Sequence, residues 1–589
     1  MQFISFFQAF WVLFVFYLLF FWLPKKLLAK KPDFLTQLTS SYLYATLVMF
    51  IGVYFLIYLN ILNWLTLLLC YLFWPFVIWF RNTFWQTQTS ISSYLASKFL
   101  QLLDLVEFSS LTKTFPEYLK TKSKEIYLKL FTNLGRFNFS NPNTTLAVLA
   151  TIILLTFSLV FRFSQPLQEL RFARSDSYQT LLESWQILLG EPSKITCYSS
   201  IIASLSSLAA INPLQTIKFF SPILGIFLVF ILALTVWQLS SQKSIGLIAS
   251  YILGAYTFSF PIDKKITNPP SFLVIINDYL EKSMVYQMFG QEMTLAVIFS
   301  LLAIISWCKV IEGRQNLAFK QNLINSLICL FLLALTFPLM LIPTFLTMAI
   351  LLIYRPLALA MFSFSLASLV ILPIIKDPTQ ILSKELIFIL PISLTLFIST
   401  FYQLINYFLK IFTNKYNEII LVLFFIILAS LFLPSAPKFQ YLEYDITARK
   451  TLEISEQYPK KQWLIVAPVE QLASSYGKGW YQDLAEFVEK NQEKVANPDF
   501  YLSSTLETFI FVEKKPFTVF DSEPLSVPFA TLTDPTYHYY RSLAGRASLE
   551  QQALTLCETY RKLHPETKIY YEDEVLRIYY IQKVEAKLH

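Results

Sequence analysis

The sequence predicts a polytopic α-helical membrane protein with a C-terminal extracytoplasmic α/β domain. Of its 589 residues, 55% are hydrophobic and only 15% are charged, which leaves too few charges to cover a water-soluble protein of this length. Apolar runs recur as far as residue 434, and most are near the ~17–25 residues that cross a bilayer. Beyond them, the pattern changes to short alternating strands and helices. We therefore expect most of the chain before residue 435 to lie in lipid.

The apolar runs predict about twelve transmembrane helices. They lie at residues 4–23, 41–62, 63–80, 145–161, 219–240, 245–260, 293–308, 322–340, 341–354, 357–375, 386–409 and 419–434. None of these runs contains Asp, Glu, Lys, Arg or His, so we expect the membrane interior to be a scaffold and not an ion path. The first run has no cleavage site of small residues and precedes a cluster of lysines, which favours a retained anchor over a signal peptide.

The distribution of basic residues predicts the orientation. The loops expected in the cytoplasm hold 19 Lys and Arg residues, and the expected external loops 162–218, 261–292 and 376–385 hold 10. Residues 1–434 carry 29 basic and 17 acidic residues, whereas the tail carries 18 and 22. The positive-inside rule explains this excess without a nucleic-acid partner, and it places the tail outside the cell membrane.

The chain divides into four parts on this basis. Residues 1–80 form the N-terminal transmembrane helices, and 81–144 form a polar cytoplasmic segment. Residues 145–434 form a second transmembrane core with the external loops 162–218 and 261–292. Residues 435–589 form the soluble extracytoplasmic α/β domain.

The tail shows both helical and strand periodicity. Helices are expected at 441–458, 480–490 and 548–563, and strands at Trp463–Val469, at 509–520 with a break at Lys514–Pro516, and in a terminal hairpin of Lys568–Tyr571 and Val575–Ile581. Gly477 and Gly479 follow the first strand. Their spacing fits neither a dinucleotide-binding nor a Walker motif, which favours an ordinary turn over a phosphate-binding loop.

The first external loop carries a cluster of charges just beyond a predicted span. Arg171, Arg174 and Asp176 precede a segment with apolar residues at helical spacing, namely Leu181, Leu182, Trp185, Leu188 and Leu189. This pattern predicts an interfacial helix that presents a carboxylate and two cations at headgroup depth. In the alternative interpretation, the arginines snorkel, and Asp176 caps the helix or forms an ion pair with them.

The small number of cysteines and histidines limits the metal sites and catalytic bases that the chain could form. The five cysteines show no spacing typical of a zinc site or a disulfide framework, and the three histidines all lie in the tail. A catalytic base in the membrane half would therefore be a carboxylate.

With its external charged loop, multi-span core and external tail, the chain resembles the GT-C superfamily of polyprenyl-phosphate-sugar-dependent membrane glycosyltransferases. The resemblance covers the layout of residues 145–589. It implies that Asp176 is the catalytic base, and that Arg171 and Arg174 contact the donor phosphate. It also implies a site in the second external loop, where the candidates are Asp263, Lys264, Lys265, Asp278, Glu281, Lys282 and Glu292. Asp176 is followed by Ser177 and the tail lacks a Trp-Trp-Asp motif, so protein N-glycosylation is not implied.

The expected function is transfer of a sugar from a polyprenyl-phosphate-linked donor to a glycan, lipid or protein acceptor outside the cell, by an inverting mechanism. Metal dependence stays open, because a divalent ion would need carboxylates from both loops to converge. Two alternatives remain: a transporter or flippase of lipid-linked sugars, and a non-catalytic membrane scaffold. Few glycines and no charges within the spans argue against a transporter.

Overall fold

A computed structural model describes much of both halves of the chain. The described residues are 2–27, 33–80, 159–160, 162–172, 176–190, 192, 194–240, 243–254, 288–313, 317–376, 384–412, 445–458, 463–468, 479–502, 506–515 and 543–582. The polar segment 81–144, nearly all of the predicted span 145–161, the span 419–434 and all but the end of the second external loop lie outside these residues.

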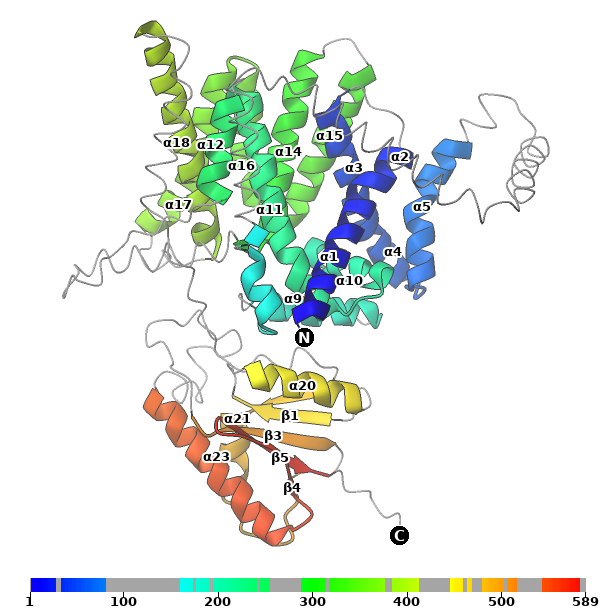
Figure 1. The fold of residues 1–589 in the computed structure, drawn as a ribbon, viewed down its shortest axis with the longest axis vertical. Helices are drawn as coiled ribbons and strands as arrows, with labels where there is room; N and C mark the ends of the chain where they lie inside the picture. The colour runs from blue at the N-terminus through cyan, green and yellow to red at the C-terminus, as the bar shows by residue number, and fades with distance from the viewer. Residues whose placement is uncertain are drawn as a thin grey trace, which may run out of the picture.

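The described residues form a helical bundle and a separate small sheet domain (Figure 1). Within the described ranges, six helical segments are long and apolar enough to cross a membrane: Ser5–Lys25, Phe34–Tyr58, Pro213–Ser240, Glu292–Glu312, Phe319–Thr336 and Phe388–Ile405. Phe331, Ile342, Phe364 and Phe397 of the bundle are each more than half exposed. Such a surface is costly in water and favourable in lipid, so these helices fit a membrane protein.

The bundle helices follow the predicted apolar runs, with some differences in length. They are α1 (Gln2–Tyr17), α2 (Leu23–Leu27), α3 (Phe34–Leu47), α4 (Val53–Tyr58), α5 (Trp64–Phe80), α11 (Pro213–Ser240), α12 (Lys243–Gly254), α14 (Glu292–Glu312), α15 (Leu317–Thr336), α16 (Leu341–Leu351), α17 (Arg355–Lys376) and α18 (Lys384–Phe412). Helix α16 has 11 residues, fewer than a span needs. The count of about twelve spans remains a prediction.

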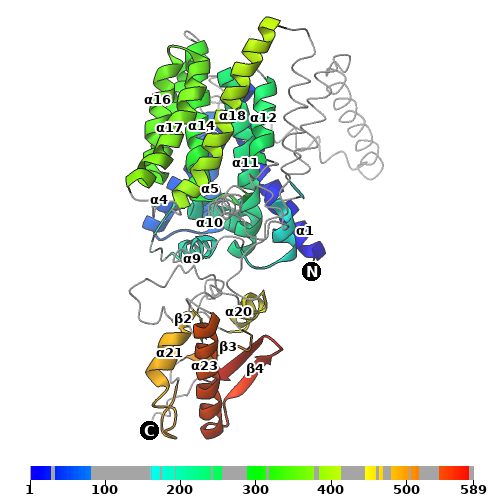
Figure 2. The ribbon, with the colours of Figure 1, turned by 90° about the vertical axis from the view of Figure 1, so that its left-hand side faces the viewer.

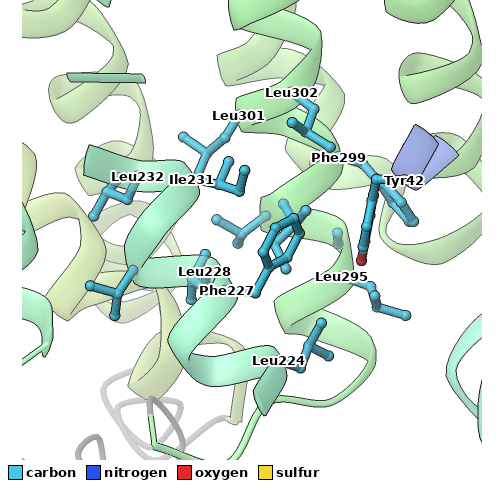
Figure 3. Packing of buried hydrophobic residues seen from close by; sticks show 14 of the residues in the cluster. Tyr42, Leu224, Phe227, Leu228, Ile231, Leu232, Leu295, Phe299, Leu301 and Leu302 are labelled. Atoms are coloured by element: carbon cyan, nitrogen blue, oxygen red, sulfur yellow. The ribbon is translucent and has the colours of Figure 1, made fainter. Parts of the chain in front are cut away.

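The core of the bundle forms where α11 packs against α14 and α3 (Figure 3). Phe227 and Leu228 of α11 and Phe299 of α14 are buried there. The ring of Tyr42 from α3 lies 4.8 Å from that of Phe227, centroid to centroid. The hydroxyl of Thr235 in α11 is satisfied within its own helix, because its Oγ1 donates to the carbonyl of Ile231 at 2.8 Å.

An ion-pair network lies at one end of the bundle. Lys309 Nζ is 2.9 Å from Glu312 Oε2 and 4.0 Å from Asp33 Oδ2, and Arg355 Nη1 is 2.9 Å from Glu312 Oε1. They belong to the loops 24–40 and 309–321 and to the short turn at Arg355, which the alternation of spans predicts to lie on one side of the membrane. Which side faces the cytoplasm stays a prediction.

The other end of the bundle faces the sheet domain, and we call it the domain-facing end. It carries two short helices, α9 (Asp176–Leu188) and α10 (Cys197–Ala209), and the N-terminus of the chain lies nearby (Figures 1 and 2). Helix α9 is the helix predicted in the first external loop. Helix α10 is buried and was not expected, because the sequence analysis treated residues 162–218 as one loop.

The tail forms a five-stranded sheet in the order β2-β1-β3-β5-β4. Its elements are α20 (Asp445–Gln457), β1 (Trp463–Ala467), β2 (Trp480–Asp483), α21 (Leu484–Asn491), β3 (Glu507–Glu513), α23 (Leu543–Leu563), β4 (Lys568–Glu572) and β5 (Leu576–Ile581). Strand β1 runs parallel to β2 and β3, and β5 runs antiparallel to β3 and β4. The predicted terminal hairpin is therefore confirmed. Helices α21 and α23 cover one face, and α20 covers the other.

Two details of the tail differ from the sequence analysis. The helix expected at 480–490 begins only after a short strand, β2. Gly479 precedes this strand, and a Cβ atom built on it would lie 2.2 Å from atoms of the Trp463 ring. Packing against a buried indole therefore requires glycine at this position. Gly477 lies outside the described residues.

Candidate functional site

The candidate site lies at the domain-facing end of the bundle. Helices α9 and α10, the starts of α11 and α14, and helix α20 of the tail gather there (Figures 1 and 2). Segments that are 275 residues apart in the sequence meet in this region, where the backbone N–H of Leu170 donates to Asp445 Oδ1 at 3.1 Å.

Helix α9 places the predicted catalytic carboxylate next to the end of the second external loop. Asp176 is the first residue of α9. The following residue, Ser177, is buried, and its Oγ accepts a short hydrogen bond from Nε2 of Gln291. Gln291 directly precedes α14, so this bond joins the two loops that the sequence analysis predicts to be external. The side chain of Asp176 lies outside the described residues, as do Arg174, Asp263, Lys264, Lys265, Asp278, Glu281 and Lys282.

Two carboxylates, the buried Glu183 and the half-buried Glu292, lie around the N-terminus of α10. Glu292 Oε2 accepts the backbone N–H of Tyr198 at 2.8 Å, in the first turn of α10. Glu183 of α9 accepts from Gln179 Nε2 at 3.1 Å and from Thr196 Oγ1 at 3.4 Å. Burial raises the pKa of Glu183, and hydrogen bonds from its neighbours oppose that shift. A helix N-terminus attracts negative charge, so these carboxylates fix α10 against α9 and α14.

Of the two predicted phosphate contacts, only Arg171 is among the described residues. Its Nη2 lies 2.9 Å from Glu169 Oε2, and its backbone carbonyl accepts from Gln165 Nε2 at 2.7 Å. Its guanidinium charge is therefore balanced by Glu169. A phosphate would have to share this cation with that carboxylate.

Two buried cations near the site were missed by the sequence analysis. Arg162 is buried, and its Nη1 donates to the carbonyl of Gly254 at 2.8 Å, at the end of α12. A cation is favoured at a helix C-terminus, which explains this contact. Desolvation by burial lowers the pKa of Arg162 to about 10.

Lys218 is the second buried cation. It lies in the second turn of α11, its side chain is 6% exposed, and its Nζ is 5.4 Å from the centroid of the Phe219 ring. Among the described residues, no group forms an ion pair or a hydrogen bond with its ammonium. Asp445, Glu169 and Arg449 lie close enough to act on it electrostatically. The predicted span began at residue 219, so the pattern placed Lys218 just outside the membrane without any sign that it would be buried.

Helix α20 connects the tail to this site because one of its faces packs against the sheet and the opposite face packs against the bundle. Ile446 and Ile454, eight residues apart, pack against the sheet. Ala448 and Leu452, four residues apart, pack against the core of the bundle. Asp445 starts the helix, and its Oδ2 accepts from Arg449 Nε at 2.5 Å. The tail is therefore held against the first-loop segment and the bundle by both apolar and polar contacts.

A metal centre is not evident within the part of the chain that the structure describes, where no group of three or more His, Cys, Asp or Glu side chains is placed to hold an ion. The acidic residues of the second loop lie outside that part, so metal dependence stays open.

Of the predicted site, the structure brings together the start of α9, the end of the second loop with Glu292, and Arg171. It adds Glu183, Arg162, Lys218 and Asp445 to the same region. Comparisons of the chain with protein-family models, with curated proteins and with solved structures gave no match.

Proposed function

We propose that the chain is a membrane glycosyltransferase of the GT-C type. It would transfer a sugar from a polyprenyl-phosphate-linked donor to an acceptor on the extracytoplasmic side of the cell membrane. The observation that supports this most is the hydrogen bond between Gln291 and Ser177. It joins the helix that starts at Asp176 to the end of the second loop, and these are the two segments to which the resemblance assigns the reaction.

The proposed reaction needs only a base and cations. The Asp176 carboxylate takes the proton of an acceptor hydroxyl. At the same time, the oxygen of that hydroxyl attacks the anomeric carbon of the donor. The bond from that carbon to the phosphate oxygen breaks, and the phosphate leaves with the bonding electrons. Cationic side chains at the headgroup level stabilise the charge that develops on it. The attack from the opposite side inverts the anomeric centre.

The lipid-facing bundle suits such a donor. A polyprenyl chain is apolar and remains in the bilayer, whereas its sugar phosphate lies at the headgroups. Helix α9 would lie at that depth, because it packs across the domain-facing end of the candidate spans (Figure 2). Glu183 and Glu292 would act as positioning residues, because they hold α9, α10 and α14 together.

The proposal is tested by sugar transfer from a panel of lipid-linked donors, with the purified full-length protein in lipid nanodiscs. Asp176→Asn keeps the size of the side chain and removes its proton affinity, so we expect the rate to fall by roughly 10²–10⁴-fold. The matched control is Asp33→Asn at the opposite end of the bundle, which makes the same change in a residue that caps α3. Its rate should stay at the wild-type level.

The arginines provide a second comparison in the same assay. Arg174→Ala should raise the KM for the donor more than it changes kcat, if the contact is equally strong in the ground and transition states. An active wild type with an equally active Asp176→Asn variant would remove Asp176 from the mechanism.

A flippase for lipid-linked sugars is the second candidate, and one observation favours it. Amide and hydroxyl groups form a cluster between α3 and α15, in which the buried Asn325 Nδ2 donates to the buried Ser40 Oγ at 2.9 Å and the half-buried Gln321 Nε2 donates to Asn325 Oδ1 at 3.1 Å. Polar groups inside candidate spans are typical of substrate pathways. Movement of lipid-linked sugar across liposomes without any sugar transfer would support this candidate over the glycosyltransferase.

A further inference from the structure

The length of α11 places Lys218 at the membrane surface. The helix has 28 residues, which correspond to ~42 Å at 1.5 Å per residue. The hydrocarbon core of a bilayer is only ~30 Å thick, so α11 must extend beyond it. Lys218 lies near the end of α11 that faces the sheet domain, where a lipid headgroup would meet the protein.

The environment of Lys218 is unusual for a buried cation. An ammonium removed from water is normally compensated by a hydrogen-bonded anion. Within the described part of the chain, no carboxylate lies within 4 Å of its Nζ, which is 5.4 Å from the centroid of the Phe219 ring. Asp445 and Glu169 favour its positive charge from a longer distance, whereas Arg449 opposes it. An anion that reached Lys218 directly would gain an interaction that the protein itself does not supply.

The carboxylate of Asp445 belongs to the tail and not to the bundle. It accepts the backbone N–H of Leu170 and pairs with Arg449 one turn further along α20. The pair with Arg449 lies within one helix and moves with it, whereas the bond to Leu170 breaks when α20 leaves the bundle. A second anion beside Lys218 would repel both Asp445 and Glu169.

We propose that Lys218 binds the phosphate group of a membrane lipid, and that this phosphate competes with Asp445 for the charge of Lys218. Binding of the lipid phosphate therefore loosens helix α20, and with it the C-terminal domain, from the first-loop segment. This inference rests on the proposed function, because it identifies the lipid phosphate as that of the polyprenyl-phosphate-linked donor. It assigns to Lys218 a contact that the sequence analysis gave to Arg171 and Arg174.

Hydrogen exchange of the full-length protein in nanodiscs tests the inference without an activity measurement. The two peptides of interest cover residues 165–172, with the Leu170 amide, and residues 445–458. Addition of decaprenyl phosphate should speed their exchange by about tenfold or more, the effect of losing one hydrogen bond to a charged group. Peptides that cover β3 and β5 report the fold of the tail itself and should not change.

Two variants and a control assign the effect to the named residues. Lys218→Gln should abolish the response to decaprenyl phosphate, whereas Lys309→Gln at the opposite end of the bundle should respond like the wild type. Asp445→Asn removes the competing charge, so its exchange should be fast before any addition, and it should bind decaprenyl phosphate about tenfold more tightly than the wild type. Unchanged exchange in the core of α14 shows that each variant is folded.

The probes also separate the possible sources of phosphate. Decaprenol, which has the same chain without the charge, should have no effect, and inorganic phosphate at the same concentration should have little. A response to inorganic phosphate alone would contradict a lipid ligand. Unchanged or slower exchange with decaprenyl phosphate, or a normal response of Lys218→Gln, would overturn the inference.

The outcomes for the inference and for the proposed function are distinguishable. Loosening of α20 by decaprenyl phosphate in a protein that transfers no sugar would refute the glycosyltransferase and keep the phosphate site. Sugar transfer with no change in exchange would keep the glycosyltransferase and refute the competition between the phosphate and Asp445.

Discussion

A buried ion pair in the C-terminal domain gives a quantitative prediction about the tail. Arg546 of α23 and Glu513 of β3 are 0% and 1% exposed. They form a bidentate pair, in which Arg546 Nε donates to Glu513 Oε2 at 2.8 Å and Nη2 donates to Oε1 at 2.7 Å. Arg546→Met keeps most of the apolar stem and removes the charge. The carboxylate of Glu513 then loses the bidentate pair with Arg546 while it stays buried.

The expected cost is large compared with the stability of a domain of this size. Removal of one partner of a buried ion pair typically costs ~3–5 kcal/mol. The free energy of unfolding of a domain of about 150 residues is only ~5–15 kcal/mol. At about 2–4 °C per kcal/mol, the melting temperature of the tail should fall by ~6–20 °C. The matched control is Arg561→Met in the same helix. Arg561 is 41% exposed and lies 3.7 Å from Glu558, so its loss should cost only ~0–1 kcal/mol.

The assay is urea and thermal unfolding of a fragment that starts at residue 440, which we expect to be soluble and to unfold cooperatively. The double variant Arg546→Met/Glu513→Leu replaces both charges by apolar groups, so it should recover much of the lost stability. Equal stabilities of Arg546→Met and Arg561→Met would refute the reasoning. A double variant less stable than Arg546→Met would also contradict it.

Three further predictions concern packing, pH and topology. Gly479→Ala should lower the free energy of unfolding of the same fragment by ~1–3 kcal/mol, because its methyl group would overlap the Trp463 ring; wild-type stability would contradict that contact. The pKa of Glu183 is raised above 4.5 in the folded protein, so the folded state retains a proton that the unfolded chain loses. Stability in nanodiscs should therefore decrease as the pH rises from 4.5 through the raised pKa, and thermal melts of Glu183→Gln should show a flatter profile. Cysteine labels in intact cells should react from outside at positions in 435–589 and only after permeabilisation at positions in 81–144; the reverse pattern would invert the proposed orientation.

The amino-acid sequence by itself determined the local features of this protein. The apolar runs that predict α1, α11 and α14 depend on residue type and period alone, and so does the alternation that predicts the hairpin of β4 and β5. The helix that begins at Asp176 was predictable for the same reason, because its buried residues recur every three or four positions. Short elements were missed where the pattern is brief, as in β2 with its four residues.

Only the tertiary structure decided which charged residues share one site. Nothing local to Lys218 indicates its burial, since that depends on α11 extending toward α20, more than 200 residues later. Ser177 and Gln291 meet because α9 and α14 start at the same level of the bundle, and Leu170 meets Asp445 because α20 has a second apolar face. Hydrophobic periodicity shows which face of a helix is buried, but it does not show which partner covers that face. The partner depends on long-range packing, and here that packing brings the carboxylates and cations of two loops and the tail together.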